Sequence, residues 1–462
     1  MINSKTLILL LLFISNNISG QPLNKFSGQT VSKDLDFLYN TLIETHYNIY
    51  AYTTEEEFKE KYLKLKHSIA QDTLTLLETI NLYQQLVASI KNGHTSIDFP
   101  FQSYINYAKS GGTIFPLELV FENRKALVRK NWSSNEMIKN GDEILSINGK
   151  EINEVLSQIY NLVSAERQYF KNVKIELFSF PRYYWQVYGK VDEFNIEVKS
   201  NGSTSLHTIN SVNLIEGFEQ KRDEIINPKA ELKFYEQAAY LNPGNFSGDE
   251  DQYQKFIDSA FALVNEKKIS NLIIDFKNNG GGNDSFSDYL ISYFADKPFH
   301  WNSSFTLKTS QTLKNIVLQN NDTTERYWKE IVNRENGEIY NYEFDPYTPQ
   351  PENKRYKGKV FVMVNRQSHS QSAVAAAQIQ DYGFATIVGE ETGDYPSLYA
   401  SIFQFALPET NITVNVSKGY IIRVNGSTKE EGVIPDIQIK DYLLDENDEI
   451  LTGLLEIINK SK

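Results

Sequence analysis

The chain has 462 residues, and its 59 acidic and 46 basic side chains give a formal net charge of -13. Such an acidic protein is not expected to take a nucleic-acid backbone or an anionic membrane surface as its main partner. The absence of cysteine excludes disulfides, thiolate metal sites, a cysteine nucleophile and a lipidated N-terminal cysteine. At about 100–200 residues per domain, a mature chain of about 440 residues predicts two to four domains.

Residues 1–20 have the layout of a secretory signal peptide. Lys5 is the only charged side chain before an apolar run at residues 6–14, and polar residues and Gly20 follow that run. The run is far shorter than the roughly 20 residues of a membrane span. We therefore expect an exported protein, periplasmic or secreted, without a stable membrane anchor. The alternative interpretation is a buried N-terminal helix.

The next segment, residues 28–105, is predicted to be an N-terminal helical domain. Its first apolar residues recur at helical spacing: Val31, Leu35, Leu38 and Leu42. Thr54 and Glu57 have the spacing of a capping box at the start of a second helix. A third helix is expected at residues 74–91, ended by Asn92 and Gly93.

Residues 110–200 change to short apolar runs separated by turn residues, which indicates strands. Within them, residues 141–150 read GDEILSINGK and precede an expected helix from Ile152. This string resembles the strand and turn of a PDZ domain, so a PDZ-like β-rich insert is predicted. The alternative is an ordinary hairpin with an Asn–Gly turn.

Residues 230–462 alternate between helices and continuous apolar strands. The strands are expected at residues 272–276, 360–364 and 385–389, and the helices at 253–266, 285–294 and 373–380. This alternation predicts an α/β core with a sheet covered on both faces.

Three places in the chain could supply catalytic groups, although each also has a plain structural interpretation. A glycine turn at residues 278–283 could present N–H groups to an oxyanion, or be only a turn. Ser370, between a strand and a helix, could be a nucleophile or a helix cap. His94 could be a general base or a surface histidine. The P-loop, H-E-x-x-H, G-x-G-x-x-G and G-x-S-x-G motifs are absent.

Five strings of the sequence, taken in their order along the chain, resemble peptidase family S41, the C-terminal processing (tail-specific) and tricorn-core-like serine peptidases. The similar strings are LIIDFKNNGGG at 272–282, GKVFVMVN at 358–365, QDYG at 380–383, VGEETG at 388–393 and EGVIPD at 431–436. The resemblance implies a ClpP/crotonase-like catalytic core at residues 230–462, with the helical domain and the PDZ-like insert before it.

The resemblance also implies site residues. Ser370 falls at the position of the family's nucleophile, with Ser372 as the runner-up, and the backbone N–H groups of Gly281 and Gln371 would form the oxyanion hole. No cofactor or metal is implied.

The base differs between branches of the family. The processing-protease branch uses a lysine in a T-x-G-K string, and this chain has no lysine at residues 392–396. The tricorn-like branch uses a histidine in a D-G-H-T string, which His94 in Asn92–Gly93–His94–Thr95 resembles. Its glutamate would be Glu430 or Glu431, and the register between these two stays open.

These expectations together predict an exported serine endopeptidase that acts on peptides or unfolded proteins, with substrate recognition by the PDZ-like insert. The alternative is a catalytically inactive descendant that binds peptides by strand addition. Hydrolysis of an ester or a carbohydrate is a weaker third option, because no paired carboxylate motif supports a glycosidase.

Overall fold

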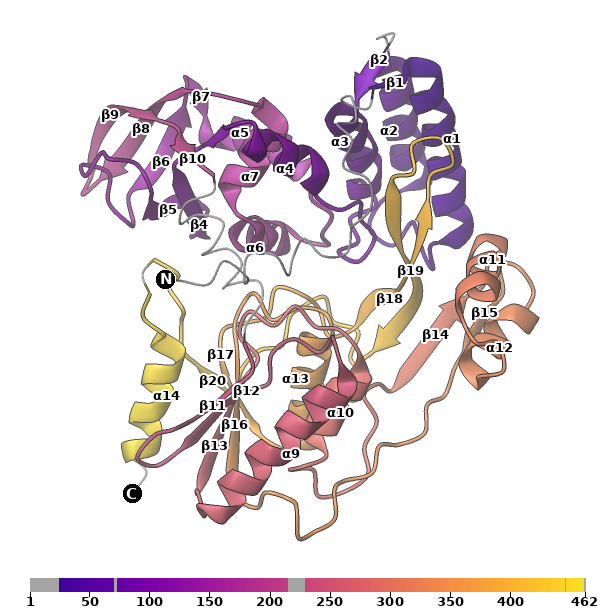
Figure 1. Cartoon of the computed structure of the whole chain (residues 1–462), viewed down its shortest axis with the longest axis vertical. Helices are drawn as coiled ribbons and strands as arrows, with labels where there is room; N and C mark the ends of the chain where they lie inside the picture. Colours follow the sequence, from indigo (N-terminus) through magenta and orange to yellow (C-terminus); the bar gives the residue numbers. More distant parts are fainter. Residues whose placement is uncertain (1–24, 70–72, 215–228, 445, 461–462) are drawn as a thin grey trace.

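The computed structural model describes residues 25–69, 73–214, 229–444 and 446–460. The predicted leader at residues 1–20 lies outside these ranges. Figure 1 shows three groups of elements: N-terminal helices in indigo, an insert in purple and magenta, and an α/β core from rose to yellow. In the described ranges, no helix combines the length and the apolar character that crossing a membrane requires.

The α/β core is built on a mixed sheet that is mostly parallel, with strand order β11-β12-β13-β16-β17-β20. Its strands are β11 (Glu231–Phe234), β12 (Ala239–Asn242), β13 (Asn271–Asp275), β16 (Lys359–Val364), β17 (Thr386–Gly389) and β20 (Ile437–Gln438). Only the edge pair β11–β12 is antiparallel. The three predicted buried strands are therefore confirmed as β13, β16 and β17.

Helices cover both faces of this sheet, which explains why its central strands β13, β16 and β17 are mainly apolar. The helices are α9 (Glu250–Glu266), α10 (Asp284–Ile291), α13 (Gln371–Tyr382) and α14 (Glu449–Lys460). Leu272 and Ile274 pack into the core with α9, α10 and α13, whereas Ile273 packs against α14. Successive residues of a strand point to opposite faces, so each face needs its own apolar residues. Figure 1 shows α14 on the side of the sheet opposite α9 and α10.

Three of the four described N-terminal helices share a core with a second sheet that the C-terminal half of the chain supplies, whereas the fourth packs against Trp185 of the insert. The four helices are α1 (Gly28–Thr45), α2 (Glu55–Ser68), α3 (Leu76–Ala88) and α4 (Phe101–Lys109), with the short pair β1 (Lys25–Ser27) and β2 (Thr73–Thr75). The second sheet has the order β15-β14-β19-β18. Its elements are β14 (Ser304–Lys308), β15 (Ile339–Asn341), β18 (Leu398–Ala406) and β19 (Thr413–Ile422), with α11 (Gln311–Asn320) and α12 (Arg326–Asn333).

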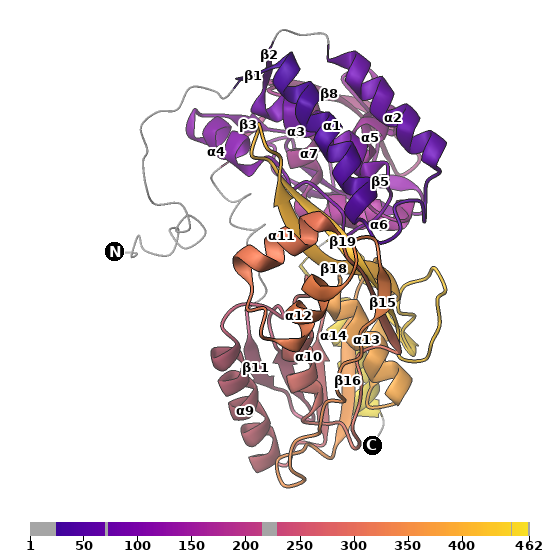
Figure 2. The same ribbon diagram turned by 90° about the vertical axis from the view of Figure 1, so that its right-hand side faces the viewer.

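One apolar cluster joins Leu35 and Leu86 of the helices to Val414 and Val416 of β19. Figures 1 and 2 show the β18–β19 hairpin extending from the α/β core to lie along α1. The predicted capping box is present at α2, where the Thr54 hydroxyl accepts the Glu57 N–H and the Glu57 carboxylate accepts the Thr54 N–H. Residues 28–105 are thus helical but do not form an independent core.

The insert, here residues 113–213, is a sheet of order β4-β5-β6-β8-β9 packed against three helices. Its elements are β3 (Thr113–Ile114), β4 (Leu117–Glu122), β5 (Lys125–Asn131), β6 (Glu143–Ile147), β7 (Lys150–Glu151), α5 (Ile152–Tyr160), α6 (Gln168–Phe178), α7 (Phe180–Tyr188), β8 (Glu193–Ser200), β9 (Ser203–Asn210) and β10 (Val212–Asn213). The expected Asn148–Gly149 turn joins β6 to β7, and both turn residues have positive φ, at 52° and 76°.

Two features of the insert differ from the sequence prediction. Strand β9 pairs with β8 along its whole length, so the insert extends beyond the predicted end at residue 200. The helices α6 and α7 occupy a segment predicted only as strand-rich. Phe180 and Tyr184 of α7 are four residues apart and pack together against the sheet. This helical spacing was overlooked because the surrounding apolar residues read as short strand-like runs.

Candidate active site

Ser370 lies where the chain leaves β16 and enters α13, and its backbone is strained. Its φ of 52° and ψ of -123° fall in a region that residues with a side chain rarely adopt. The Ser370 N–H donates to Asp394 Oδ2 at 2.8 Å, which holds this conformation. Although Ser370 occupies the N-cap position, its hydroxyl caps no backbone N–H. The interpretation of Ser370 as a helix cap is therefore wrong. Backbone strain of this kind is commonly found at functional sites.

The hydroxyl of Ser370 instead meets His94. The distance between His94 Nε2 and Ser370 Oγ is 3.0 Å, although 276 positions separate the residues in sequence. His94 is buried just after α3. The turn that carries it is fixed by Asn92, whose side chain accepts from Ser417 Oγ of β19 and donates to the Tyr399 carbonyl of β18. The fold therefore brings together the predicted base and the predicted nucleophile.

The protonation of His94 is set mainly by its burial. Burial lowers the pKa of His94 to about 3, while the nearby Asp394 carboxylate acts in the opposite direction. The imidazole is therefore neutral at pH 7. For Nε2 to accept the Ser370 proton, the ring proton must sit on Nδ1, which is buried and has no hydrogen-bond partner among the described residues.

The carboxylate next to this pair is Asp394, which the sequence analysis missed. Asp394 is buried, and its Oδ2 lies 3.7 Å from His94 Nε2. Its other oxygen accepts the N–H of Tyr395 at 3.0 Å. Asp394 lies in the segment 392–396, where the processing-protease string has its lysine and this chain has none. An aspartate in the segment where a lysine was expected was the sequence signal for Asp394, because a buried carboxylate requires a positively charged or hydrogen-bonding partner nearby.

Glu430 and Glu431 were predicted to orient the base, and the structure places them elsewhere. Glu430 is exposed, and Glu431 pairs with Lys429 at 3.7 Å. In the described residues neither contacts His94. The physical reason is that the loop before Val433 runs past Thr392, which accepts the Val433 N–H. This register holds both glutamates away from the imidazole.

Of the two backbone N–H groups predicted to form the oxyanion hole, only one is free of a hydrogen bond to the described residues. The Gly281 N–H donates to Asn279 Oδ1 at 2.8 Å, because the Asn279 side chain closes the glycine turn. The Gln371 N–H, at the start of α13, makes no hydrogen bond to the described residues. A Cβ built on Gly281 would lie 2.7 Å from the Gln371 nitrogen, so only glycine allows these two backbones to approach. The two predicted donors are therefore adjacent, and one of them is occupied.

The runner-up Ser372 has no base beside it. Its hydroxyl is buried and contacts the Phe276 carbonyl at 3.4 Å. Ser368 is also buried, and its hydroxyl donates to the same carbonyl at 2.8 Å. Of the three serines in this turn, Ser370 alone has a histidine within hydrogen-bonding distance of its hydroxyl.

The insert contributes charged groups to the surroundings of His94. Glu166, just before α6, accepts the Gly93 N–H at 2.7 Å and the Asn92 amide at 3.0 Å. Burial raises the pKa of Glu166, and the charge of Asp394 adds to this. Lys174 of α6 donates to the Gly93 carbonyl at 2.7 Å. The histidine turn is thus held by the insert on one side and by β18 and β19 on the other.

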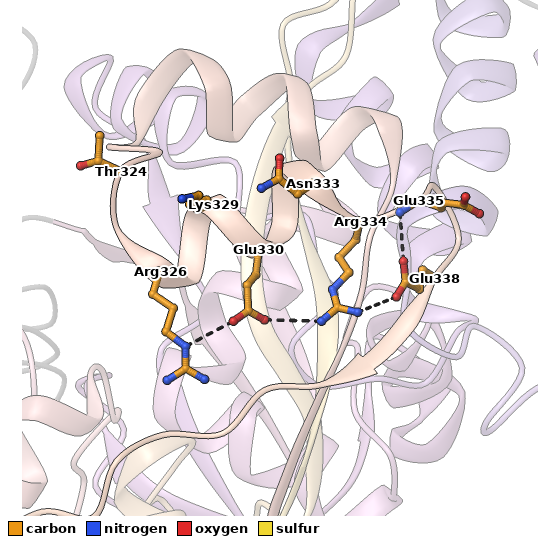
Figure 3. Close-up of a pocket in the computed structure, with 8 residues that line it drawn as sticks. All are labelled: Thr324, Arg326, Lys329, Glu330, Asn333, Arg334, Glu335 and Glu338. Carbon is orange, nitrogen blue, oxygen red and sulfur yellow. Dashed lines mark hydrogen bonds and ion pairs between the residues drawn. The ribbon is translucent and has the colours of Figure 1, made fainter.

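A surface hollow of about 660 Å³ lies elsewhere, over α12. Figure 3 shows that its side chains form a ladder in which Glu330 pairs with Arg326 and Arg334, and Arg334 pairs with Glu338. These side chains are partly exposed and include no nucleophile with a base. The hollow is therefore not a second candidate for the reaction site.

Comparison with known proteins gives a family match for the C-terminal half of the chain. Residues 237–439 match the family model of peptidase family S41. The chain is 30% identical over 195 residues to a tail-specific protease of Haemophilus influenzae, a match that covers 40% of this chain and 23% of the relative. The chain therefore spans about a quarter of the length of that relative.

Two solved structures share the fold over nearly the whole chain. Mature CPAF aligns with a TM-score of 0.65 at 15% identity, covering 94% of this chain and 96% of that chain. Mature CPAF complexed with lactacystin aligns with a TM-score of 0.64 at 15% identity, covering 94% and 97%. At this identity the similarity concerns the fold alone.

Proposed function

Because the chain belongs to peptidase family S41 through residues 237–439, we propose that it is a serine peptidase with Ser370 as nucleophile and His94 as general base. One observation carries this proposal: the 3.0 Å distance between His94 Nε2 and Ser370 Oγ. That distance is within the range expected for a base and the proton that it abstracts.

The reaction follows from this geometry. His94 Nε2 takes the Ser370 proton while Ser370 Oγ attacks the peptide carbonyl carbon, and a tetrahedral oxyanion forms. The carbon–nitrogen bond then breaks, and the leaving amine takes the proton from His94, which leaves an ester on Ser370. Water attacks this ester as His94 removes its proton, and Ser370 recovers a proton when the new carboxyl end leaves.

Two groups stabilise the charges that develop. The Gln371 N–H at the start of α13 is free to donate to the oxyanion, and the Gly281 N–H becomes a second donor once it leaves Asn279 Oδ1. Asp394 carries the negative charge beside the imidazolium that forms on His94, at 3.7 Å from Nε2. In this proposal Asp394 takes the electrostatic role that the sequence analysis gave to Glu430 or Glu431.

We propose peptides or unfolded proteins as substrates, and export to the periplasm or the medium. The support for export is the leader-like composition of residues 1–20. The support for peptide recognition by the insert, as a PDZ-like domain, is its GDEILSINGK turn and a sheet whose strand β9 is an edge strand.

A non-catalytic peptide-binding protein is the second candidate, and two observations favour it. Among the described residues, His94 Nδ1 has no carboxylate partner that would fix its tautomer, and the Gly281 N–H is occupied by Asn279. In that case a fluorescent peptide would bind the protein and keep both termini after long incubation.

Two serine variants with peptide hydrolysis as readout distinguish these candidates. Ser370→Ala is expected to abolish turnover of an unfolded protein substrate, whereas Ser372→Ala, two residues away and also at the start of α13, should retain it. Products are measured by mass spectrometry and folding by circular dichroism. Turnover by the folded Ser370→Ala variant at the rate of the parent would contradict the assignment.

A further inference from the structure

A second histidine faces the catalytic pair. One ring nitrogen of His94, one ring nitrogen of His369 and a carboxylate oxygen of Asp394 all lie within 4.8 Å of one another. Asp394 Oδ2 is 3.7 Å from His94 Nε2 and 3.4 Å from His369 Nε2. The two imidazole rings are nearly parallel, with an interplanar angle of 9° and centroids 5.0 Å apart.

The His369 side chain has no role in the proposed peptidase mechanism. Its backbone N–H donates to the Asn279 carbonyl, and its ring packs on Phe170 of α6. Its Nε2 is buried and makes no hydrogen bond to the described residues, although it faces the Asp394 carboxylate. Buried ring nitrogens normally have a hydrogen-bond partner, so this nitrogen is available to bind a ligand.

We propose that His94, His369 and Asp394 bind one zinc ion, and that the bound ion reversibly blocks the peptidase. The inhibitory part rests on the proposed function, whereas the binding part does not. Two imidazole nitrogens and one carboxylate oxygen are ligands that Zn²⁺ prefers, with water or another small ligand in the fourth position. Mg²⁺ and Ca²⁺ prefer oxygen ligands and do not suit this set.

Two of the three separations between ligand atoms are close to those around such an ion, and the third, between the two imidazoles, is within 4.8 Å. Ligands at about 2.0–2.1 Å from a tetrahedral zinc lie about 3.3 Å from each other. The observed separations of 3.4 and 3.7 Å from the Asp394 oxygen are within a few tenths of an ångström of that value. One ring must tilt out of the parallel arrangement so that both lone pairs meet at the ion. Lys174, which raises the positive potential at both histidines, lowers the affinity of the site.

Inhibition follows because the lone pair of His94 Nε2 cannot bind zinc and accept the Ser370 proton at the same time. His94 Nε2 is the atom that lies 3.0 Å from Ser370 Oγ and would take its proton. When Nε2 binds zinc, the proton of Ser370 has no acceptor, and the peptidase is inactive until the ion leaves. The ion is thus a regulator at the site rather than a cofactor of the reaction.

The test measures binding separately from activity, using the full chain freed of metal by a chelator. Binding of Zn²⁺ is followed by calorimetry, and binding of Co²⁺ by the visible absorption of a tetrahedral cobalt complex. One ion per chain is expected for the parent and for Ser370→Ala, which is inactive but keeps all three ligands. His369→Asn should weaken binding at least about 10-fold, since loss of even an outer-shell partner costs about 10–100-fold. The exposed His67→Asn is the matched control and should bind as the parent does.

The same preparations decide the inhibitory part. Zn²⁺ at the concentration that saturates the site should abolish peptide hydrolysis, EDTA should restore it, and Mg²⁺ should have no effect. Should His369→Asn not fold, His369→Phe, which keeps a ring beside Phe170, replaces it. No binding to Ser370→Ala, or equal binding by the parent and the His369 variant, would overturn the site. Binding without inhibition of an active parent would overturn the regulatory part, and binding to a protein that hydrolyses no peptide would reject only the proposed function.

Discussion

At the scale of single residues, the central problem is a base that is hard to protonate. In the proposed mechanism His94 must carry a positive charge for part of each turnover, yet it is buried and its pKa is lowered to about 3. Desolvation penalises the charged imidazole, so a nearby negative charge has to offset this cost. Asp394, itself buried, is the carboxylate in position to do so at 3.7 Å.

The first prediction concerns this carboxylate. Asp394→Asn should lower kcat by about 10- to 1,000-fold, because opposite charges about 4 Å apart attract by about 4 kcal/mol at an effective dielectric constant of about 20. The control variants Glu430→Gln and Glu431→Gln should each change kcat by less than about 2-fold. Steady-state kinetics on one peptide gives all three values. A large loss in a glutamate variant with none in Asp394→Asn would restore the role predicted from the sequence.

The second prediction concerns pH. A group with a lowered pKa stays deprotonated until the pH falls close to that value, so His94 remains an acceptor well below the ordinary histidine range. The kcat/KM should therefore show no loss centred near pH 6.5, and should be about constant between pH 5 and 7. Circular dichroism at each pH confirms that the protein is folded. An acid limb near pH 6.5 in the folded protein would show that the base is not a buried neutral imidazole.

At the scale of elements, Arg366 ties the insert to the segment that carries Ser370. Its guanidinium lies 2.6 Å from Glu122 of β4, 2.8 Å from Glu390 and 3.5 Å from Glu176 of α6. Arg366 follows β16 and stands four residues before Ser370. Burial raises the pKa of Glu176 to about 7, and the charge of Arg366 opposes this rise. The insert is thus docked on this segment through a buried cation.

The third prediction follows from this contact. Arg366→Met should lower the free energy of unfolding by about 3–5 kcal/mol, because it leaves buried carboxylates without their partner. Arg334→Met, in the exposed ladder of Figure 3, is the matched control and should cost less than about 1 kcal/mol. Urea denaturation measures both. Equal losses in the two variants would mean that burial does not set the strength of the Arg366 contacts.

Helices and strands with a clear pattern of apolar residues could be predicted from the sequence, whereas elements that depend on tertiary packing could not. The strands β13, β16 and β17 are continuous apolar runs because both of their faces are covered, and α13 follows a turn that the sequence marks. Strand β18 alternates more and less buried residues, whereas β19 is buried over six consecutive residues that include polar Asn415, Ser417 and Lys418. The burial of these polar residues depends on packing against distant elements, so the role of the hairpin could not be predicted from the local pattern.

At the scale of the whole molecule, the candidate site exists only when three parts of the chain meet. The N-terminal helices carry His94, the α/β core carries Ser370 and Asp394, and the insert supplies Glu166 behind the histidine turn. The β18–β19 hairpin, which shares a core with the helices, fixes this arrangement. Resemblance to a family could identify Ser370 and His94 because each lies in a short string. It could not identify Asp394, whose place beside His94 depends on the meeting of distant segments.

The most direct test of the account is covalent labelling by a phosphonyl fluoride probe, with the modified peptide identified by mass spectrometry. We expect one label per chain, on Ser370, and a labelling rate that falls by at least about 100-fold in His94→Gln, since a positioned base contributes about 10²–10⁴-fold. Ser372→Ala should be labelled as fast as the parent. Labelling of another serine, or equal rates in the parent and a folded His94→Gln variant, would contradict the claim that His94 activates Ser370.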